Sequence, residues 1–141
     1  MPKVSRNFFQ GKEILFLGYS GKNESFCKMI LEAMSNNGFK VYPVNNNQSR
    51  KFDNKVYNNI SELPSIPENV YIMMNIDNTV KAIADLKNKG VKRILFQNKK
   101  VVNESLLEQC RQMGIDTAIA CPMMMFGKGL HRFHGFLAGV R

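Results

Sequence analysis

Short apolar runs that alternate with helical patterns restrict the possible folds of this chain more than any other feature. Residues 14–17 read Ile-Leu-Phe-Leu and are followed by Gly18, as is typical of a strand buried on both faces of a sheet. By the same criterion we expect strands at residues 13–18, 39–44, 70–74, 92–96 and 115–119, with a short edge strand at residues 55–57.

Helical spacing of apolar residues fills the segments between these runs. The first stripe, which predicts a helix ending near Gly38, consists of Phe26, Met29, Ile30, Ala33 and Met34. Three more helices are expected: one at about residues 78–89 with Val80, Ile83 and Ala84 facing inward, one capped by Asn103 and stopped by Gly114, and one from about Leu130.

Strands that alternate with helices in this way are joined by right-handed crossovers and form a parallel sheet covered on both faces. We therefore predict an α/β fold, namely a Rossmann-like three-layer α/β/α sandwich around a mainly parallel sheet of five or six strands. The length of 141 residues, without a linker-like segment, predicts a single domain over residues 1–141.

The net charge of +9 indicates an anionic partner, since 20 Lys and Arg residues face only 11 Asp and Glu. Nucleic acid, an anionic membrane surface and a phosphorylated cofactor all fit this charge. No window approaches the roughly 18 apolar residues of a membrane span, and no secretory leader is recognisable, which predicts a cytoplasmic protein without a membrane partner. The sequence contains no zinc finger, helix-turn-helix or aromatic RNA-binding motif, which disfavours nucleic acid.

Three cysteines, Cys27, Cys110 and Cys121, form an odd set without C-x-x-C spacing. This pattern indicates neither a disulfide framework nor a zinc site. Cys27 and Cys110 lie on expected helix faces and are predicted to be buried thiols. His131 and His134 stand at i and i+3 on the last expected helix without a third metal ligand nearby, so no metal site is predicted.

Sheets of this class bind ligands beyond the carboxyl ends of the strands, where the strand order reverses. The first turn at this edge, residues 18–23, reads Gly-Tyr-Ser-Gly-Lys-Asn and leads into a helix, whose backbone N–H groups suit a pyrophosphate. The dinucleotide fingerprint G-x-G-x-x-G requires glycine also at the positions of Ser20 and Asn23. A tight connection in which Ser20 caps the helix therefore remains an alternative for this turn.

The end of the second strand argues against NAD. NAD-binding domains usually place a carboxylate there to bind the ribose diol. Here Val44 is followed by Asn45, with Arg50 and Lys51 ahead of the first acidic residue, Asp53. A neutral-to-basic end suits a ribose that carries a phosphate, as in NADP or coenzyme A (CoA).

The order of four motifs resembles the CoA-binding domain family. These motifs are the turn at residues 18–22, Val-Tyr-Pro-Val-Asn at 41–45, Lys-Val-Tyr at 55–57 with Ile-Ser-Glu-Leu-Pro at 60–64, and Ile-Leu-Phe-Gln at 94–97. The family comprises small proteins similar to the N-terminal domain of the succinyl-CoA synthetase alpha subunit, and the resemblance extends from about Glu13 to Pro122.

The resemblance implies a site for CoA or an acyl-CoA, residue by residue. Gly18, Tyr19 and Ser20 match the pyrophosphate turn, Asn45 the adenosine end, Asn75 and Ile76 the pantetheine path, Gln97 the Gln after the fourth strand, and Cys121 a Cys after the fifth. Gly21 and Lys22 stand where the family usually has Arg-Asn, so Lys22 or Arg50 is expected to supply the phosphate-binding cation. Lys99 and Lys100 add positive charge at the same edge.

The resemblance stops at the CoA-binding half of the synthetase, and 141 residues leave no room for the half that carries the phosphorylated histidine. We therefore expect a cytosolic CoA-binding protein without autonomous catalysis and without catalytic residues. Two alternatives remain: an NADP-dependent or other nucleotide-dependent enzyme that uses Cys121 or a histidine, and a basic nucleic-acid or partner-binding module. The sequence leaves open whether the last expected helix packs on the sheet or on a second subunit.

Overall fold

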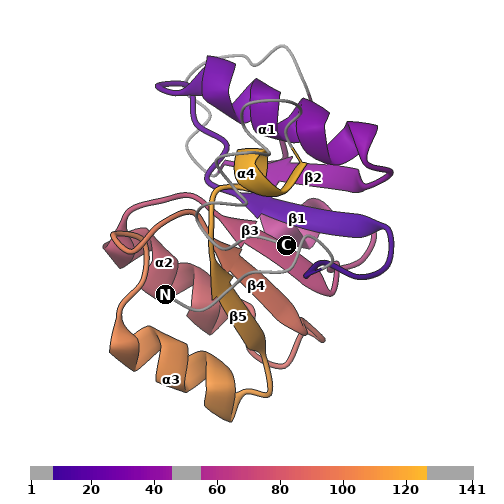
Figure 1. Ribbon diagram of the computed structural model, residues 1–141. Coiled ribbons are helices and arrows are strands. Elements are labelled where there is room, and N and C mark those ends of the chain that lie inside the picture. Colours follow the sequence, from indigo (N-terminus) through magenta and orange to yellow (C-terminus); the bar gives the residue numbers. More distant parts are fainter. Residues whose placement is uncertain (1–7, 46–54, 127–141) are drawn as a thin grey trace.

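Five parallel strands form the centre of the molecule in the order β2-β1-β3-β4-β5 (Figure 1). The computed structural model describes residues 8–45 and 55–126. The strands are β1 (Glu13–Leu17), β2 (Lys40–Val44), β3 (Asn69–Ile72), β4 (Arg93–Phe96) and β5 (Asp116–Ile119). The helices are α1 (Glu24–Asn36), α2 (Ile76–Asp85), α3 (Glu104–Gln112), α4 (Pro122–Phe126) and the short 3-10 helix η1 (Ile60–Glu62). The predicted Rossmann-like parallel α/β fold is confirmed.

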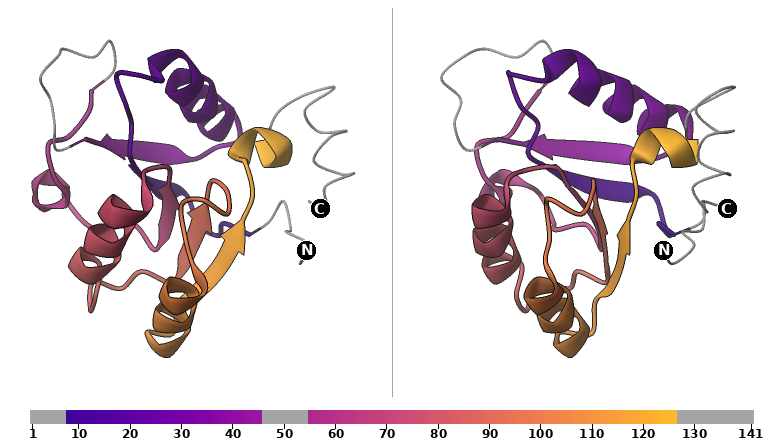
Figure 2. Two further views of the ribbon diagram at one scale, coloured as in Figure 1. Left: turned by 90° about the vertical axis from the view of Figure 1, so that its left-hand side faces the viewer. Right: turned by 60° about the vertical axis from the view of Figure 1, so that its left-hand side comes forward.

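The alternation of side chains along each strand divides the core into two clusters, one on each face of the sheet. On one face Leu15 and Leu17 of β1 pack with apolar residues of α2 and α3. On the other face Ile14 and Phe16 pack with residues of α1 and α4. Figure 2 shows the same division, with α1 and α4 on one side of the sheet and α2 and α3 on the other. Burial on both faces explains why the strands read as continuous apolar runs.

Three residues expected to face the core, Met29, Val80 and Ala84, are exposed instead. Met29 is 43% and Val80 is 46% exposed. The buried face of α1 is centred on Cys27, Ile30 and Met34, and Met29 falls beside it. In α2 the buried residues are Thr79 and Ile83, so Val80, one position from Thr79, is rotated out of the core.

The third strand, the edge strand and the helix expected at about residues 78–89 differ from their predicted bounds, and the last of these is α2, which runs from Ile76 to Asp85. The third strand ends at Ile72, two residues earlier than predicted, because Asn75 caps α2 and starts that helix at Ile76. The edge strand expected at residues 55–57 is reduced to a single parallel bridge between Tyr57 and Val44. The helix expected from Leu130 lies outside the described residues.

At the amino edge of the sheet, hydrogen bonds of the buried Asn69 side chain connect neighbouring strands. Asn69, which is 1% exposed, donates from Nδ2 to the carbonyl oxygens of Gln10 at 2.6 Å and Glu13 at 2.9 Å. Its Oδ1 accepts from Arg93 Nε at 2.7 Å. One buried amide thus ties the segment before β1 to β1, β3 and β4, with its polar groups satisfied inside the protein.

At the carboxyl edge the strands end level with one another. Leu17 of β1 is in register with Val44 of β2 and with Ile72 of β3, and Ile72 is in register with Phe96 of β4. The chain leaves β1 for α1 on one face and leaves β3 for α2 on the opposite face. The strand order therefore reverses between β1 and β3, which is where ligands bind in sheets of this class.

Gly18 directly follows β1, at the point where the chain passes close to the end of β3 before it turns toward α1. Its φ is +99°, and a Cβ built on it would overlap the carbonyl oxygen of Met73 and lie 2.7 Å from the Met73 carbonyl carbon. Its N–H donates to the Val44 carbonyl oxygen at 3.2 Å. Backbone packing between adjacent strand ends is therefore sufficient to require glycine here, without reference to a ligand.

We expect Gly18→Ala to lower the free energy of unfolding by about 3 kcal/mol or more, because it combines left-handed strain with overpacking against fixed backbone. Gly90→Ala is the matched control, since Gly90 also has a positive φ, +82°, but nothing lies within 4 Å of its Cβ position. The control should lose about 1 kcal/mol. Urea unfolding of both variants measures the difference, and equal losses would contradict a role for the Met73 carbonyl.

Candidate ligand-binding site

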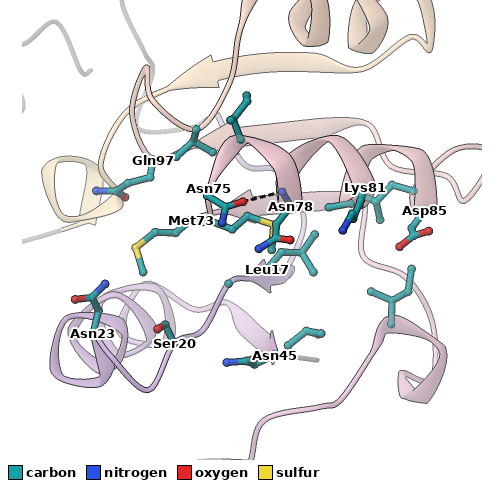
Figure 3. A pocket seen from close by; sticks show the side chains of 18 of the residues that line it. Leu17, Ser20, Asn23, Asn45, Met73, Asn75, Asn78, Lys81, Asp85 and Gln97 are labelled. Atoms are coloured by element: carbon teal, nitrogen blue, oxygen red, sulfur yellow. Dashed lines mark hydrogen bonds between the residues drawn. The ribbon is translucent and has the colours of Figure 1, made fainter. Parts of the chain in front are cut away.

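A cavity of about 870 Å³ opens at the carboxyl edge, over the point where the strand order reverses (Figure 3). It is lined by the ends of β1 to β4, the turn before α1, one side of α2, the loop before η1 and the segment after β4. The lining residues are Leu17, Gly18, Ser20, Lys22, Asn23, Val44, Asn45, Asn58, Asn59, Ile60, Met73, Met74, Asn75, Ile76, Asn78, Lys81, Ala82, Asp85, Leu86, Gln97, Asn98, Lys100 and Val101. Its size is typical of cavities that hold cofactors.

Most of the site residues predicted from the sequence meet at this cavity. Seven of them line it: Gly18, Ser20, Lys22, Asn45, Asn75, Ile76 and Gln97. Tyr19 and Gly21 do not. The Tyr19 side chain is fully buried on the α1 face and packs edge-on against Phe16, with the ring centroids 5.5 Å apart. The structure therefore places the Tyr19 ring in the core, and only its backbone belongs to the turn.

The turn after β1 uses part of its hydrogen-bonding capacity internally. Ser20 N–H donates to Cys27 Sγ at 3.5 Å, and Lys22 N–H donates to Ser20 Oγ at 3.1 Å. The N-cap of α1 is Asn23, so the alternative in which Ser20 caps that helix is wrong. Because two N–H groups already have partners, a phosphate at this turn depends more on the Lys22 side chain than the sequence pattern indicates.

Asn45 joins the end of β2 to the turn. Its Nδ2 donates to the Tyr19 carbonyl oxygen at 2.8 Å, and its backbone N–H donates to the Tyr57 carbonyl oxygen at 2.9 Å. Asn45 thus fixes the wall of the cavity on the β2 side. A carboxylate here could not donate to a carbonyl oxygen, which gives the amide at this position a structural reason.

Asn75 and Ile76 begin α2 beside the cavity. Asn75 Oδ1 accepts from Asn78 N–H at 2.8 Å and caps the helix, while the Asn75 carbonyl oxygen accepts from Thr79 Oγ1 at 2.9 Å. Ile76 is half-buried and contributes to the apolar part of the lining.

Gln97 directly follows β4, and its side chain is hydrogen-bonded to a buried tyrosine. The Tyr71 hydroxyl donates to Gln97 Oε1, and Tyr71 itself is fully buried. Burial raises the pKa of Tyr71 far above its ordinary value. The hydroxyl therefore keeps its proton and remains a hydrogen-bond donor to Gln97.

Three lysines and one carboxylate supply the charge of the cavity: Lys22, Lys81, Lys100 and Asp85. Lys22 was expected, whereas Arg50 lies outside the described residues and Lys99 is not part of the lining. Figure 3 shows Lys81 and Asp85 together on α2, at the opposite end of the cavity from Asn23. Sequence reasoning missed this pair because it inspected residues directly after strands, and these two lie further along the following helix.

Carboxamides dominate the polar lining to an extent that sequence reasoning missed. They are Asn23, Asn45, Asn58, Asn59, Asn75, Asn78, Gln97 and Asn98. The available signal is the density of Asn after the strand ends, as in Asn58-Asn59 and Asn75 to Asn78, which reads from sequence alone as turn-forming residues.

The remaining candidates are Cys121 and the two histidines. Cys121, which follows β5, is half-buried and does not line the cavity, and His131 and His134 lie outside the described residues. The described residues contain no group of three or more His, Cys, Asp or Glu able to hold a metal ion. Within the same residues, no helix combines the length and apolar character needed to cross a membrane.

Fold and cavity together define a Rossmann-like α/β protein with a cavity at the carboxyl edge of its sheet. The chain belongs to the CoA binding domain family, whose model matches residues 12–127, and this confirms the resemblance drawn from the sequence.

Three solved structures share the fold. A hypothetical protein from Pyrococcus horikoshii OT3 is 23% identical with a TM-score of 0.71, covering 84% of this chain and 83% of that one. Prb, a PH1109 protein redesigned for binding, has the same identity of 23% and TM-score of 0.71, covering 87% and 89%. A conserved hypothetical protein from Pyrococcus furiosus is 20% identical with a TM-score of 0.65, covering 87% and 99%. At these identities the likeness shows the fold alone.

The environments of the three thiols predict an order of reactivity. Cys27 and Cys110 are buried, as the sequence predicts, and burial raises the pKa of Cys27 and raises that of Cys110 to about 11. A raised pKa lowers the thiolate fraction at pH 8. Iodoacetamide should therefore label Cys121 first in the native protein and all three thiols equally in urea, as measured by peptide mass spectrometry. Labelling of Cys27 ahead of Cys121 in the native protein would contradict the burial of Cys27 beneath the turn after β1.

Proposed function

We propose that this protein is a small cytosolic protein that binds CoA or an acyl-CoA in the carboxyl-edge cavity, without catalysing a reaction on its own. The observation that carries the proposal is the coincidence of family and cavity. The match to the CoA binding domain spans residues 12–127, and every residue that lines the cavity, from Leu17 to Val101, falls inside this range.

The chemistry of the lining supports a ligand with an anionic part and an apolar arm. Lys22, Lys81 and Lys100 give the lining an excess of positive charge over the single carboxylate of Asp85. Met73, Met74 and Leu17 add apolar surface to the same lining. CoA combines phosphates with a long aliphatic arm that carries amides, so both parts have a complementary surface here.

The end of β2 supports CoA over NAD. The first side chain after Val44 at this end is Asn45, whose amide already donates to the Tyr19 carbonyl oxygen. NAD-binding domains use a carboxylate at the corresponding place to accept from the ribose diol. NAD therefore serves as the negative comparison in a binding experiment.

Thermal unfolding with added ligands tests the proposal. We expect CoA or acetyl-CoA to raise the unfolding midpoint at millimolar concentration, because a ligand at one hundred times its Kd stabilises the native state by about 2.7 kcal/mol. NAD and ATP at the same concentration should raise the midpoint less. Absence of stabilisation by both CoA and acetyl-CoA would contradict the proposal. Stabilisation by NADP alone would favour a nucleotide-dependent enzyme instead.

Lysine substitutions test whether this cavity is the binding site. Lys22→Ala and Lys81→Ala should each weaken CoA binding about twofold to fivefold at low salt, and less at high salt, since exposed ion pairs are weak and screened. Lys99→Ala is the matched control, because it removes the same charge next to Lys100 but outside the lining. Isothermal titration calorimetry measures the Kd values. An equal loss in the control would show a general charge effect and contradict the assignment of the site.

A further inference from the structure

A buried tyrosine determines which way Gln97 presents its amide. Tyr71 lies in β3 with no exposed surface, its ring packed edge-on against Phe16 at 4.9 Å between centroids. Its hydroxyl donates to Gln97 Oε1. With its oxygen directed at the Tyr71 hydroxyl, the Gln97 amide has its two NH₂ hydrogens left as donors, and the oxygen can accept one further bond.

In three other carboxamides of the lining, the amide oxygen also accepts a hydrogen bond from within the protein. Asn75 Oδ1 accepts from Asn78 N–H at 2.8 Å, and Asn98 Oδ1 accepts from Lys100 N–H at 2.8 Å. Asn59 Oδ1 accepts from Ser61 N–H at 2.8 Å. In Figure 3 the Asn75 nitrogen lies on the side away from its capping bond. Local backbone structure thus binds these oxygens and leaves NH₂ groups after β3, after β4 and in the loop before η1.

The surroundings of these donors suit an uncharged acceptor. Asn75 follows Met73 and Met74 directly, and the half-buried Gln97 follows Phe96 at the neighbouring strand end. Of the lysines that suit phosphates, Lys22 stands on the turn after β1 and Lys81 on α2, while Lys100 follows Gln97 on the segment after β4. Neutral donors beside apolar side chains match carbonyl oxygens spaced along an aliphatic chain, which is the chemistry of the thiol arm of CoA.

We propose that Tyr71 is a positioning residue for ligand recognition: it holds Gln97 so that the amide NH₂ of Gln97, together with that of Asn75, donates to a carbonyl oxygen in the thiol arm of the ligand. This inference rests on the proposed function. It assigns a role to a side chain that lies wholly within the core, and it makes the β3–β4 side of the cavity selective for hydrogen-bond acceptors.

Calorimetry with three ligands tests the inference: adenosine 3′,5′-bisphosphate, which lacks the arm, CoA, and acetyl-CoA. Gln97→Glu keeps the oxygen that accepts from Tyr71 and replaces the donor by an acceptor, so CoA binding should weaken about tenfold. Tyr71→Phe releases the Gln97 oxygen and should weaken CoA binding about threefold. Both variants should bind adenosine 3′,5′-bisphosphate within about twofold of the unsubstituted protein. Equal losses for CoA and acetyl-CoA identify a pantetheine carbonyl, whereas a larger loss for acetyl-CoA than for CoA shows that the thioester carbonyl contributes as well.

Tyr42→Phe is the matched control for the loss of a largely buried tyrosine hydroxyl. Tyr42 is 4% exposed, its hydroxyl donates to Glu13 Oε2 at 2.7 Å, and it does not line the cavity. It should leave the ratio of the CoA and adenosine 3′,5′-bisphosphate Kd values unchanged, whereas Tyr71→Phe should change it. Gln97→Met, which removes the donor without adding charge, provides a second variant, and thermal unfolding shows which variants are folded.

Two outcomes overturn the inference separately from the proposed function. One is CoA binding by the unsubstituted protein that Gln97→Glu, Gln97→Met and Tyr71→Phe leave unchanged. The other is an equal loss for adenosine 3′,5′-bisphosphate, which would show a general effect of charge or folding. Failure of the unsubstituted protein to bind any of the three ligands would instead overturn the proposed function itself.

Discussion

The close approach of Gly18 to the Met73 carbonyl group is the contact on which the carboxyl edge depends. It allows β1 and β3 to run side by side to their last residue and then to send their chains to opposite faces of the sheet. The space that opens where they separate is the cavity. In the sequence, Gly18 is typical of a phosphate-binding loop. In the structure, the close approach to Met73 already requires glycine at this position, and the geometry of the cavity follows from that approach.

Side-chain amides fix the geometry around this contact. Asn45 holds the turn to β2, Asn75 caps α2, and Tyr71 holds Gln97 after β4. Each of these bonds connects a strand end to a neighbouring element, and each carboxamide also lines the cavity. The residues that shape the edge are thus the residues that a ligand would contact. Their orientation is fixed before binding, which reduces the entropic cost of recognition.

The strands and the fold class could be predicted because burial on both faces of a parallel sheet produces apolar runs that are visible in the sequence. The exposure of Met29 and Val80 could not, since apolar spacing does not specify where the centre of a helix face falls. Seven residues of the cavity lining could be predicted from the rule on strand ends and from the family resemblance. Lys81, Asp85 and the partnership of Tyr71 with Gln97 could not, because they depend on how α2 and the core are placed in three dimensions.

An NMR titration of the ¹⁵N-labelled protein with CoA shows directly whether the carboxyl-edge cavity binds this ligand. Binding there should give saturable shifts of the backbone amides at residues 18–23, 73–78 and 97–101, and of the side-chain NH₂ signals of Asn75 and Gln97. The amides around Asn69, at the opposite edge of the sheet, should not move. Shifts confined to that edge, or no saturable shift at millimolar CoA, would contradict binding of CoA in this cavity.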